Sequence, residues 1–126
     1  MAYELLGKNP KSSFGLCVRL NIWKWYELVR LLRYFNIISE SEIPLWMAND
    51  QIKLSEEESL LLLESIELNL DVNFNNFDEF IIKLYEEDIP YSHMPWHREV
   101  CCPILNSSDI KYLLLFLSDC GGFEVK

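Results

Sequence analysis

The chain has 126 residues, half of them apolar, and a formal net charge of -9 at pH 7. This length fits one domain, 1–126, and the apolar content is ample for one hydrophobic core, which excludes a disordered chain. The negative charge repels phosphates and excludes nucleic acid as the expected partner, even though Lys24, Arg30 and Arg33 lie close together in the sequence.

The start of the chain shows no targeting segment. Residues 1–10 lack the apolar stretch of a secretory signal, and the longest clearly apolar run, 112–117, is too short to cross a bilayer. The four cysteines lack the spacing of a disulfide framework. We therefore expect a cytoplasmic protein with free thiols and no membrane contact.

The first pattern along the chain indicates a short strand within residues 12–21. Phe14, Leu16, Val18 and Leu20 occupy alternate positions there. A lone strand needs a partner, and the candidate is the tail 123–125. The two segments predict a short strand pair near the chain ends.

A helix is expected over residues 22–36. Asn21 can cap it, Asn36 can end it, and apolar side chains cover most of its circumference. Such a helix usually occupies the centre of a domain, which makes Trp23 and Trp25 structural residues. The alternative is that they form a stacking platform for a ligand or for nucleic acid.

Polar residues follow this helix. Residues 39–42 predict a short acidic turn or helix that must stop or bend at Pro44, because proline lacks the amide hydrogen that a helix interior needs. Residues 49–51 predict a turn, since Asn and Asp side chains hydrogen-bond to their own backbone.

The clearest local signal is a capping box at the start of a helix over residues 55–69. Ser55 and Glu58 have the spacing at which a hydroxyl and a carboxylate each bond to a free amide at the helix start. Apolar residues from Leu60 onward predict a broad buried face, while Glu64 and Glu67 stay in water.

Another helix is expected over residues 76–87, and acidic residues on it and on the preceding helix are candidates for partner binding. Glu56 and Glu57 either favour the helix start through its dipole or belong to a binding face. Negative charge in the last turn of 76–87 opposes the dipole, so it pairs either with Arg30 and Arg33 or with a basic partner. The acidic candidates are Glu56, Glu57, Glu79, Glu86, Glu87 and Asp88.

The stretch 89–105 is expected to be a loop because it contains Pro90 and Pro95 and few periodic residues. Tyr91 and Trp96 in this loop are predicted to be aromatic anchors for a partner.

The same loop carries residue types that bind zinc, namely His93, His97, Cys101 and Cys102. Pro95 opposes a helical turn between the histidines, and the cysteines are adjacent rather than spaced, so we expect no metal and no cofactor. A small-molecule or metal-responsive module built on residues 91–102 is the alternative function.

The last helix is expected over residues 108–120 and is apolar nearly all round. Gly121 and Gly122 stop it, because glycine adopts the left-handed conformation that closes many helices. The helix either passes through the middle of the domain or uses one side for a homodimer contact.

Together these elements predict a mainly α, single compact domain of about four principal helices, near 22–36, 55–69, 76–87 and 108–120. A short terminal strand pair is an optional addition. No nucleophile signature and no phosphate-binding glycine pattern is present, so we expect no enzyme activity.

Several segments resemble a group of small, uncharacterised bacterial proteins. The resemblance is carried by Trp23-Lys24-Trp25, by Trp46 followed by Asn49-Asp50, by the Leu54-Ser55 helix start and by residues 116–125, which end in Gly-Gly-Phe-Glu-Val. It covers about two-thirds of the chain. It implies a bacterial or phage source and assigns no activity to these positions.

Charge is divided sharply along the chain. Residues 1–36 carry six lysines and arginines against two carboxylates, whereas residues 37–126 carry 18 carboxylates against five cations. Surplus carboxylate on a folded surface attracts basic partners. We expect an acidic, stoichiometric protein-binding module that blocks a basic surface, either as an immunity protein against a toxin or as a phage-encoded inhibitor of a bacterial defence enzyme.

Overall fold

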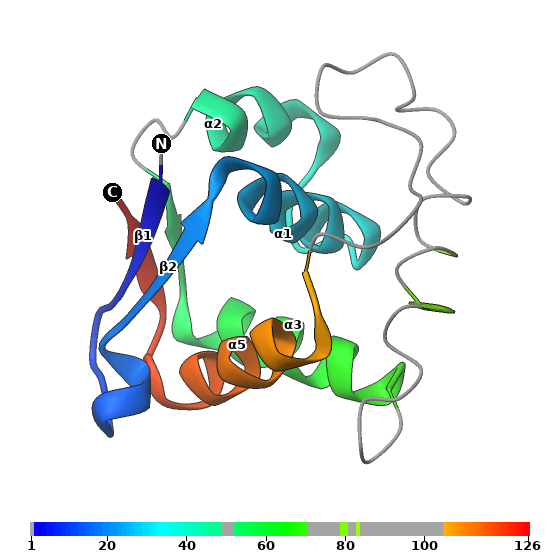
Figure 1. The fold of residues 1–126 in the computed structure, drawn as a ribbon. Helices are drawn as coiled ribbons and strands as arrows, with labels where there is room; N and C mark the ends of the chain where they lie inside the picture. The colour runs from blue at the N-terminus through cyan, green and yellow to red at the C-terminus, as the bar shows by residue number, and fades with distance from the viewer. Residues whose placement is uncertain (1, 49–51, 71–78, 81–82, 84–104) are drawn as a thin grey trace.

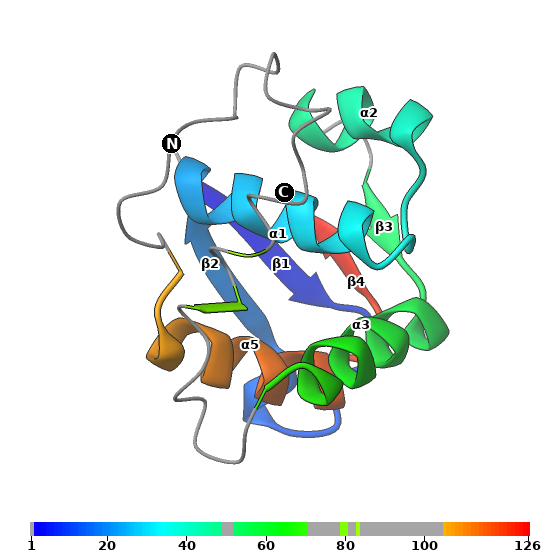
Figure 2. The same cartoon turned by 90° about the vertical axis from the view of Figure 1, so that its right-hand side faces the viewer.

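The computed structural model describes residues 2–48, 52–70, 79–80, 83 and 105–126. Its strands are β1 (Ala2–Gly7), β2 (Cys17–Asn21), β3 (Lys53–Leu54) and β4 (Phe123–Val125). Its helices are α1 (Ile22–Tyr34), α2 (Ile43–Ala48), α3 (Glu56–Leu68) and α5 (Ser107–Asp119), with the short 3-10 turns η1 (Ser13–Gly15) and η2 (Glu40–Glu42). Helices α1, α3 and α5 lie on one face of the sheet (Figure 1 and Figure 2).

The four described strands form one antiparallel sheet in the order β2-β1-β4-β3, which is larger than the predicted strand pair. The expected strand is present as β2, but it pairs with β1, where Leu5 lies opposite Val18. The tail strand β4 pairs instead with β1 and β3. The prediction of the partner was wrong because β1 has only six residues and shows little periodicity of its own.

Helix α1 occupies the centre of the domain, as predicted. The Asn21 side chain accepts a hydrogen bond from the amide of Lys24 at 2.9 Å, and Asn36 ends the helical segment with a φ of 59°. Trp25 is fully buried, whereas Trp23 is 47% exposed and does not belong to the core. Trp25 therefore has the expected place in the core, while Trp23 packs edge-on against Tyr26 at its border, with ring centroids 6.0 Å apart.

A stack of three aromatic rings joins the sheet to two helices. The Trp25 ring lies 4.9 Å from Tyr3 of β1 and 5.6 Å from Trp46 of α2, measured between ring centroids. Its indole nitrogen donates a hydrogen bond to the Trp46 carbonyl at 3.1 Å. Burying a large aromatic ring contributes several kcal/mol, so this stack fixes α2 to the rest of the core.

The acidic segment at 39–42 stops before Pro44, as expected: it forms η2, which ends at Glu42, and a separate helix, α2, begins at Ile43. Ser39 and Glu42 form a capping box before it, and Pro44 is the second residue of the helix. The first turn of a helix has amides without intrahelical partners, so proline costs little there.

The remaining described helices begin close to where they were predicted. Ser55 and Glu58 form the expected capping box of α3, and Asn106 with Asp109 forms one for α5. Helix α5 does not pass through the middle of the domain, because Tyr112 is 60% exposed while the opposite side of the helix is buried.

Parts of the chain named in the predictions lie outside the described residues. Glu79, Phe80 and Lys83 are helical, whereas the rest of 76–87, the turn 49–51 and the loop 89–104 are not described. Along the residues that are described, the structure contains no helix with the length and apolar character needed to cross a membrane.

Candidate functional site

The side of α3 that faces solvent combines leucines with glutamates. Leu60, Leu61 and Leu68 are 40%, 49% and 79% exposed, although the sequence predicted that this leucine run is buried. The core takes Leu62 and Ile66 instead. We call the exposed set the α3 outer face; it consists of Glu56, Glu57, Leu60, Leu61, Glu64, Glu67 and Leu68.

The sequence of α3 explains why this face has a fixed orientation. The capping box joins Ser55 to Glu58 in both directions, at 3.1 and 3.2 Å, and starts the helix at a defined residue. Leu62 and Ile66 then lie one turn apart on the buried side, beside the buried Ser59. The leucines on the opposite side therefore remain in solvent.

Carboxylates are concentrated on α3. The described residues carry 13 carboxylates and 10 lysines and arginines, a balance of -3. Helix α3 alone has five glutamates and no cation, so the other described residues balance at +2. The negative charge of the described part is thus a local property of one helix.

Helix electrostatics account for only part of this charge. Glu56, Glu57 and Glu58 lie in the first turn, where negative charge is favourable. Glu67 lies near the C-terminal end, where negative charge opposes the dipole, and no basic residue occupies that last turn. The position of Glu67 is therefore not explained by helix stability.

An apolar groove of about 310 Å³ runs along the boundary between α3 and α5. Leu63, Leu114 and Leu115 form its apolar lining, and Glu67 and Lys111 lie on either side of it. The groove adjoins the α3 outer face at Glu67, so the two features form one continuous surface.

One charge at the start of α3 is partly neutralised. Lys11 lies 3.4 Å from Glu56, but both side chains are about half exposed, and such surface pairs contribute little to stability. Beyond the C-terminal end of the helix, Asn69 shares a hollow of about 220 Å³ with Glu79 and Lys83. The middle of the outer face, around Glu64, has no described ion pair.

The structure describes only some of the residues that were predicted to bind a partner. Glu56, Glu57 and Glu79 are all exposed, with the first two on the α3 outer face and Glu79 across the hollow from the end of α3. The remaining predicted binding residues, and the residues of the metal-responsive alternative, lie outside the described part of the chain: Glu86, Glu87, Asp88, Tyr91, Trp96, His93, His97, Cys101 and Cys102.

Sequence reasoning did not identify Leu60, Leu61 and Leu68 as surface residues. A continuous run of leucines at 60–63 covers every side of a helix, so periodicity does not show which side is buried. The one available signal was Ser59, a small residue that packs closely on the buried side.

The described residues offer no cluster of three or more His, Cys, Asp or Glu side chains that could hold a metal ion. Among their cysteines, Cys17 is exposed and Cys120 is buried, and both are free thiols. Burial raises the pKa of the Cys120 thiol above its ordinary value of 9.0, so this group is neutral at physiological pH.

Comparisons with known proteins do not add to this picture. No protein-family model, no curated protein and no solved structure matches the chain. The resemblance to small bacterial proteins stays a prediction.

Proposed function

We propose that the protein is a non-catalytic, stoichiometric protein-binding module that docks a basic surface of its partner on the α3 outer face. The observation that carries this proposal is the alternation of exposed leucines and glutamates on a helix that has no cation. Leucines supply apolar contact area, and glutamates select a partner of opposite charge.

The arrangement favours binding of a protein over binding of a small ligand. The α3 outer face is convex, and small ligands are usually held in concave pockets that cover most of their surface. A basic protein that places apolar side chains between its lysines and arginines is complementary to this face. Such a partner also matches the groove between α3 and α5, which accepts an apolar side chain beside Glu67.

Within this class, we favour an immunity protein or a phage-encoded inhibitor of a toxin or defence enzyme. Enzymes that act on nucleic acids need basic clefts, and a rigid acidic helix can cover such a cleft. Charge complementarity speeds the encounter, while the buried leucines determine how long the complex lasts.

The first test asks whether association depends on the negative charge of the α3 outer face or only on the net charge of the protein. The partner is isolated by affinity capture from a bacterial lysate and its binding is then measured by surface plasmon resonance. The double variant Glu64→Gln with Glu67→Gln should slow association about three- to tenfold, because the electrostatic attraction at the binding face is reduced. The control Glu40→Gln with Glu124→Gln removes the same charge elsewhere and should leave association nearly unchanged. Equal slowing by both pairs would show that only net charge matters.

The second test concerns the leucines and uses a closely matched control. Leu61 is 49% exposed on α3, and Leu45 is 48% exposed on α2. Leu61→Ser should raise Kd about tenfold through faster dissociation, since a contact buried in the complex is lost. Leu45→Ser should change it less than about twofold. Wild-type affinity in Leu61→Ser would remove the α3 outer face from the interface.

A further inference from the structure

Strand β2 is at one end of the described sheet and has an outer edge that no described strand covers. It lies in front of β1 in Figure 1, and the turned view in Figure 2 places β2 and α5 on one side of the molecule and β3 and α3 on the other. The other end of the sheet is β3, which has only two residues. The two edges therefore differ in how much backbone they present.

The hydrogen-bonding pattern shows which β2 groups face outward. Glu4 exchanges both backbone bonds with Lys126, at 2.8 Å each, on the β4 side of β1. Neighbouring residues of a strand point to opposite sides, so Tyr3 and Leu5 bond to their β2 partners, Leu20 and Val18. The amides and carbonyls of Cys17 and Arg19 consequently point to the open edge.

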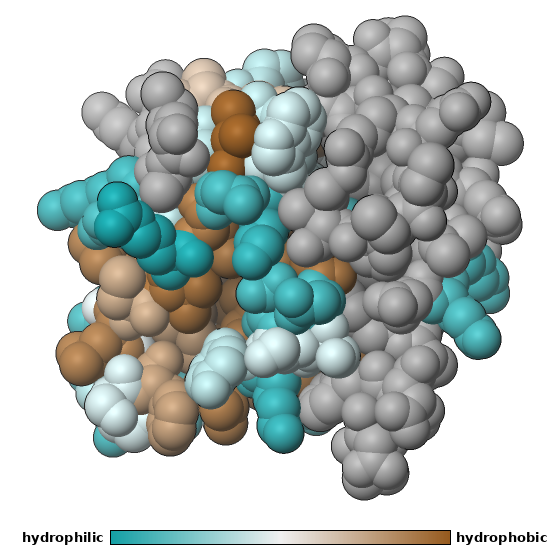
Figure 3. Space-filling model, viewed as in Figure 1, coloured by the Kyte–Doolittle hydropathy of each residue, from teal (hydrophilic) through white to brown (hydrophobic). Residues whose placement is uncertain are grey.

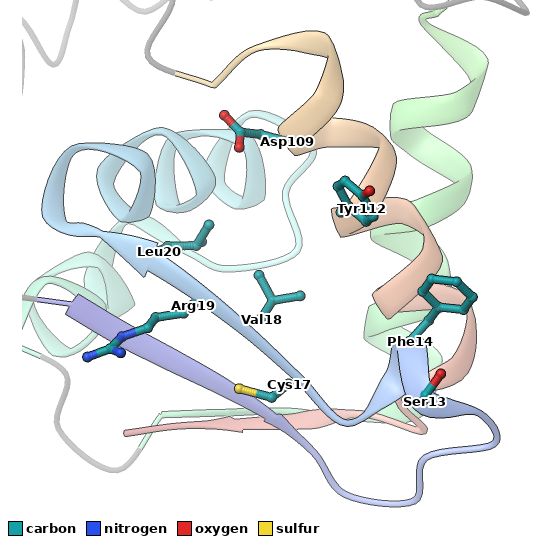
Figure 4. Close-up of a pocket in the computed structure, with 8 residues that line it drawn as sticks. All are labelled: Ser13, Phe14, Cys17, Val18, Arg19, Leu20, Asp109 and Tyr112. Atoms are coloured by element: carbon teal, nitrogen blue, oxygen red, sulfur yellow. The ribbon is translucent and has the colours of Figure 1, made fainter.

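Beside this edge is a groove of about 350 Å³ with a mixed lining, in which Ser13, Arg19 and Asp109 are the polar residues. Val18 and Leu20 line it from β2, Phe14 from η1 and Tyr112 from α5, as Figure 4 shows. Phe14 and Tyr112 are 51% and 60% exposed. Figure 3 shows brown apolar side chains over the part of this face where β2 and η1 lie.

The position of Phe14 is set by close packing of η1 on the end of α5. A Cβ atom added to Gly15 would lie 2.2 Å from the Asp119 carbonyl oxygen, so only glycine fits. The Ser12 hydroxyl also donates a hydrogen bond to the Asp119 carboxylate. Phe14 is thus held beside the open edge.

The charges near the edge compensate each other. Arg19 lies 4.0 Å from Glu4, and Lys24 lies 3.1 Å from Asp109. A second molecule that approaches this edge therefore meets little net charge, in spite of the net charge of -9 on the whole chain.

We propose that the open edge of β2 pairs antiparallel with β2 of a second copy of this chain. The strand is complementary to itself when Val18 lies opposite Val18 of the copy, because Cys17 and Arg19 then exchange backbone hydrogen bonds with Arg19 and Cys17 of the copy. A shift that places the two Arg19 side chains opposite each other brings like charges together and is unfavourable. The dimer joins two four-stranded sheets into one of eight strands.

The dimer also buries the aromatic side chains around the groove. Opposite residues in a sheet point to the same face, so the helices of both copies lie on one face and Phe14 and Tyr112 of each copy approach the other. Helix α3 lies on the side of the molecule away from β2 (Figure 2), so both α3 outer faces remain accessible. The pairing is independent of the proposed function and adds that the module presents two binding faces.

Disulfide trapping tests the register. In the proposed pairing, the two Val18 Cα atoms form a non-hydrogen-bonded pair about 4.5 Å apart, which is within the range that a disulfide spans. Val18→Cys should give a cross-linked dimer under mild oxidation that reductant separates, well above the wild-type background. Lys53→Cys, at the other edge of the sheet, is the control and should not. Native Cys17 lies opposite residue 19 of the copy in this register, so Arg19→Cys is tested in a Cys17→Ser background. Cross-linking by that variant in place of Val18→Cys, or equal cross-linking by Lys53→Cys, would overturn the proposed pairing.

Proline substitution tests the role of the backbone. The full chain should sediment at twice its mass of 15.0 kDa at concentrations of about 100 µM. Arg19→Pro removes an amide that points to the open edge and should give a monomer with an unchanged circular dichroism spectrum. Two controls should remain dimeric. Arg19→Ala keeps the amide of residue 19, and Lys53→Pro removes an outward amide from β3 instead. A wild-type monomer at this concentration, or a folded Arg19→Pro dimer, overturns the proposal; the α3 variants test partner binding separately.

Discussion

The α3 outer face and the open edge of β2 lie on different sides of the described fold and offer different groups for recognition. Helix α3 satisfies its backbone internally and presents only side chains, whereas β2 presents the backbone of Cys17 and Arg19 beside a groove. Recognition by charged side chains responds to salt and to substitution. Recognition by the backbone responds mainly to changes that remove an amide or distort the strand.

The largest effect is expected from a substitution in the hydrophobic core, because the α3 outer face and the open edge of β2 both depend on that core. Trp25 is fully buried and stacks on Tyr3 and Trp46, so Trp25→Ala should lower the free energy of unfolding by about 3–5 kcal/mol. Urea denaturation followed by circular dichroism measures this loss. Dimerisation and partner binding should fall together at the same urea concentration; loss of one without the other would show that the two regions unfold independently.

Salt is expected to have a smaller effect, but it should distinguish the α3 outer face from the open edge of β2 more clearly. Raising NaCl from about 50 mM to about 500 mM shortens the Debye length from roughly 14 Å to roughly 4 Å. Association of a basic partner with the α3 outer face should slow about tenfold, while the dimer Kd should change less than about twofold, because the ion pairs near β2 already compensate each other. Stopped-flow fluorescence and sedimentation equilibrium provide the two measurements. Equal salt dependence would contradict the division into a charged surface and a neutral one.

The smallest effect is expected from pH and compares the two described cysteines. Burial raises the pKa of the Cys120 thiol above 9.0, so the unfolded chain releases this proton first and stability falls as pH rises above 9.0. The pKa of Cys17 is also raised, mainly by burial and then by the negative charge of Glu4. This thiol is exposed, so it contributes less to the pH dependence of stability. Melting temperatures between about pH 8 and about pH 10 should decline less steeply in Cys120→Ala than in wild type. Cys17→Ala should keep the wild-type slope; the reverse order would contradict the assignment to Cys120.

Local signals in the sequence were sufficient for several helices. The Asn21 cap, the capping box of Ser55 with Glu58 and the glycines at 121 and 122 each act over a few residues, and each is present in the structure. The sheet depends instead on contacts between distant segments. Neither β1 nor β3 has enough periodicity to show that the tail at 123–125 lies between them.

The exposed surfaces were predicted less well than the helices, because exposure also depends on contacts between distant segments. Exposure of Leu61 and burial of Leu62 depend on where the sheet and α5 lie, which a run of similar residues does not indicate. Glu56 and Glu57 were expected at an exposed helix start because charge itself favours water. The apolar half of the candidate site had no such signal.

The position of β4 has a consequence for how the chain folds during synthesis. It leaves the ribosome after the other three strands of the described sheet, yet it lies between β1 and β3, and the adjoining Lys126 exchanges backbone hydrogen bonds with Glu4 of β1. The β1–β2 hairpin can form early, but the sheet is not continuous until about a hundred further residues have been translated. Nascent chains stalled before residue 123 should therefore remain sensitive to protease and depend on chaperones.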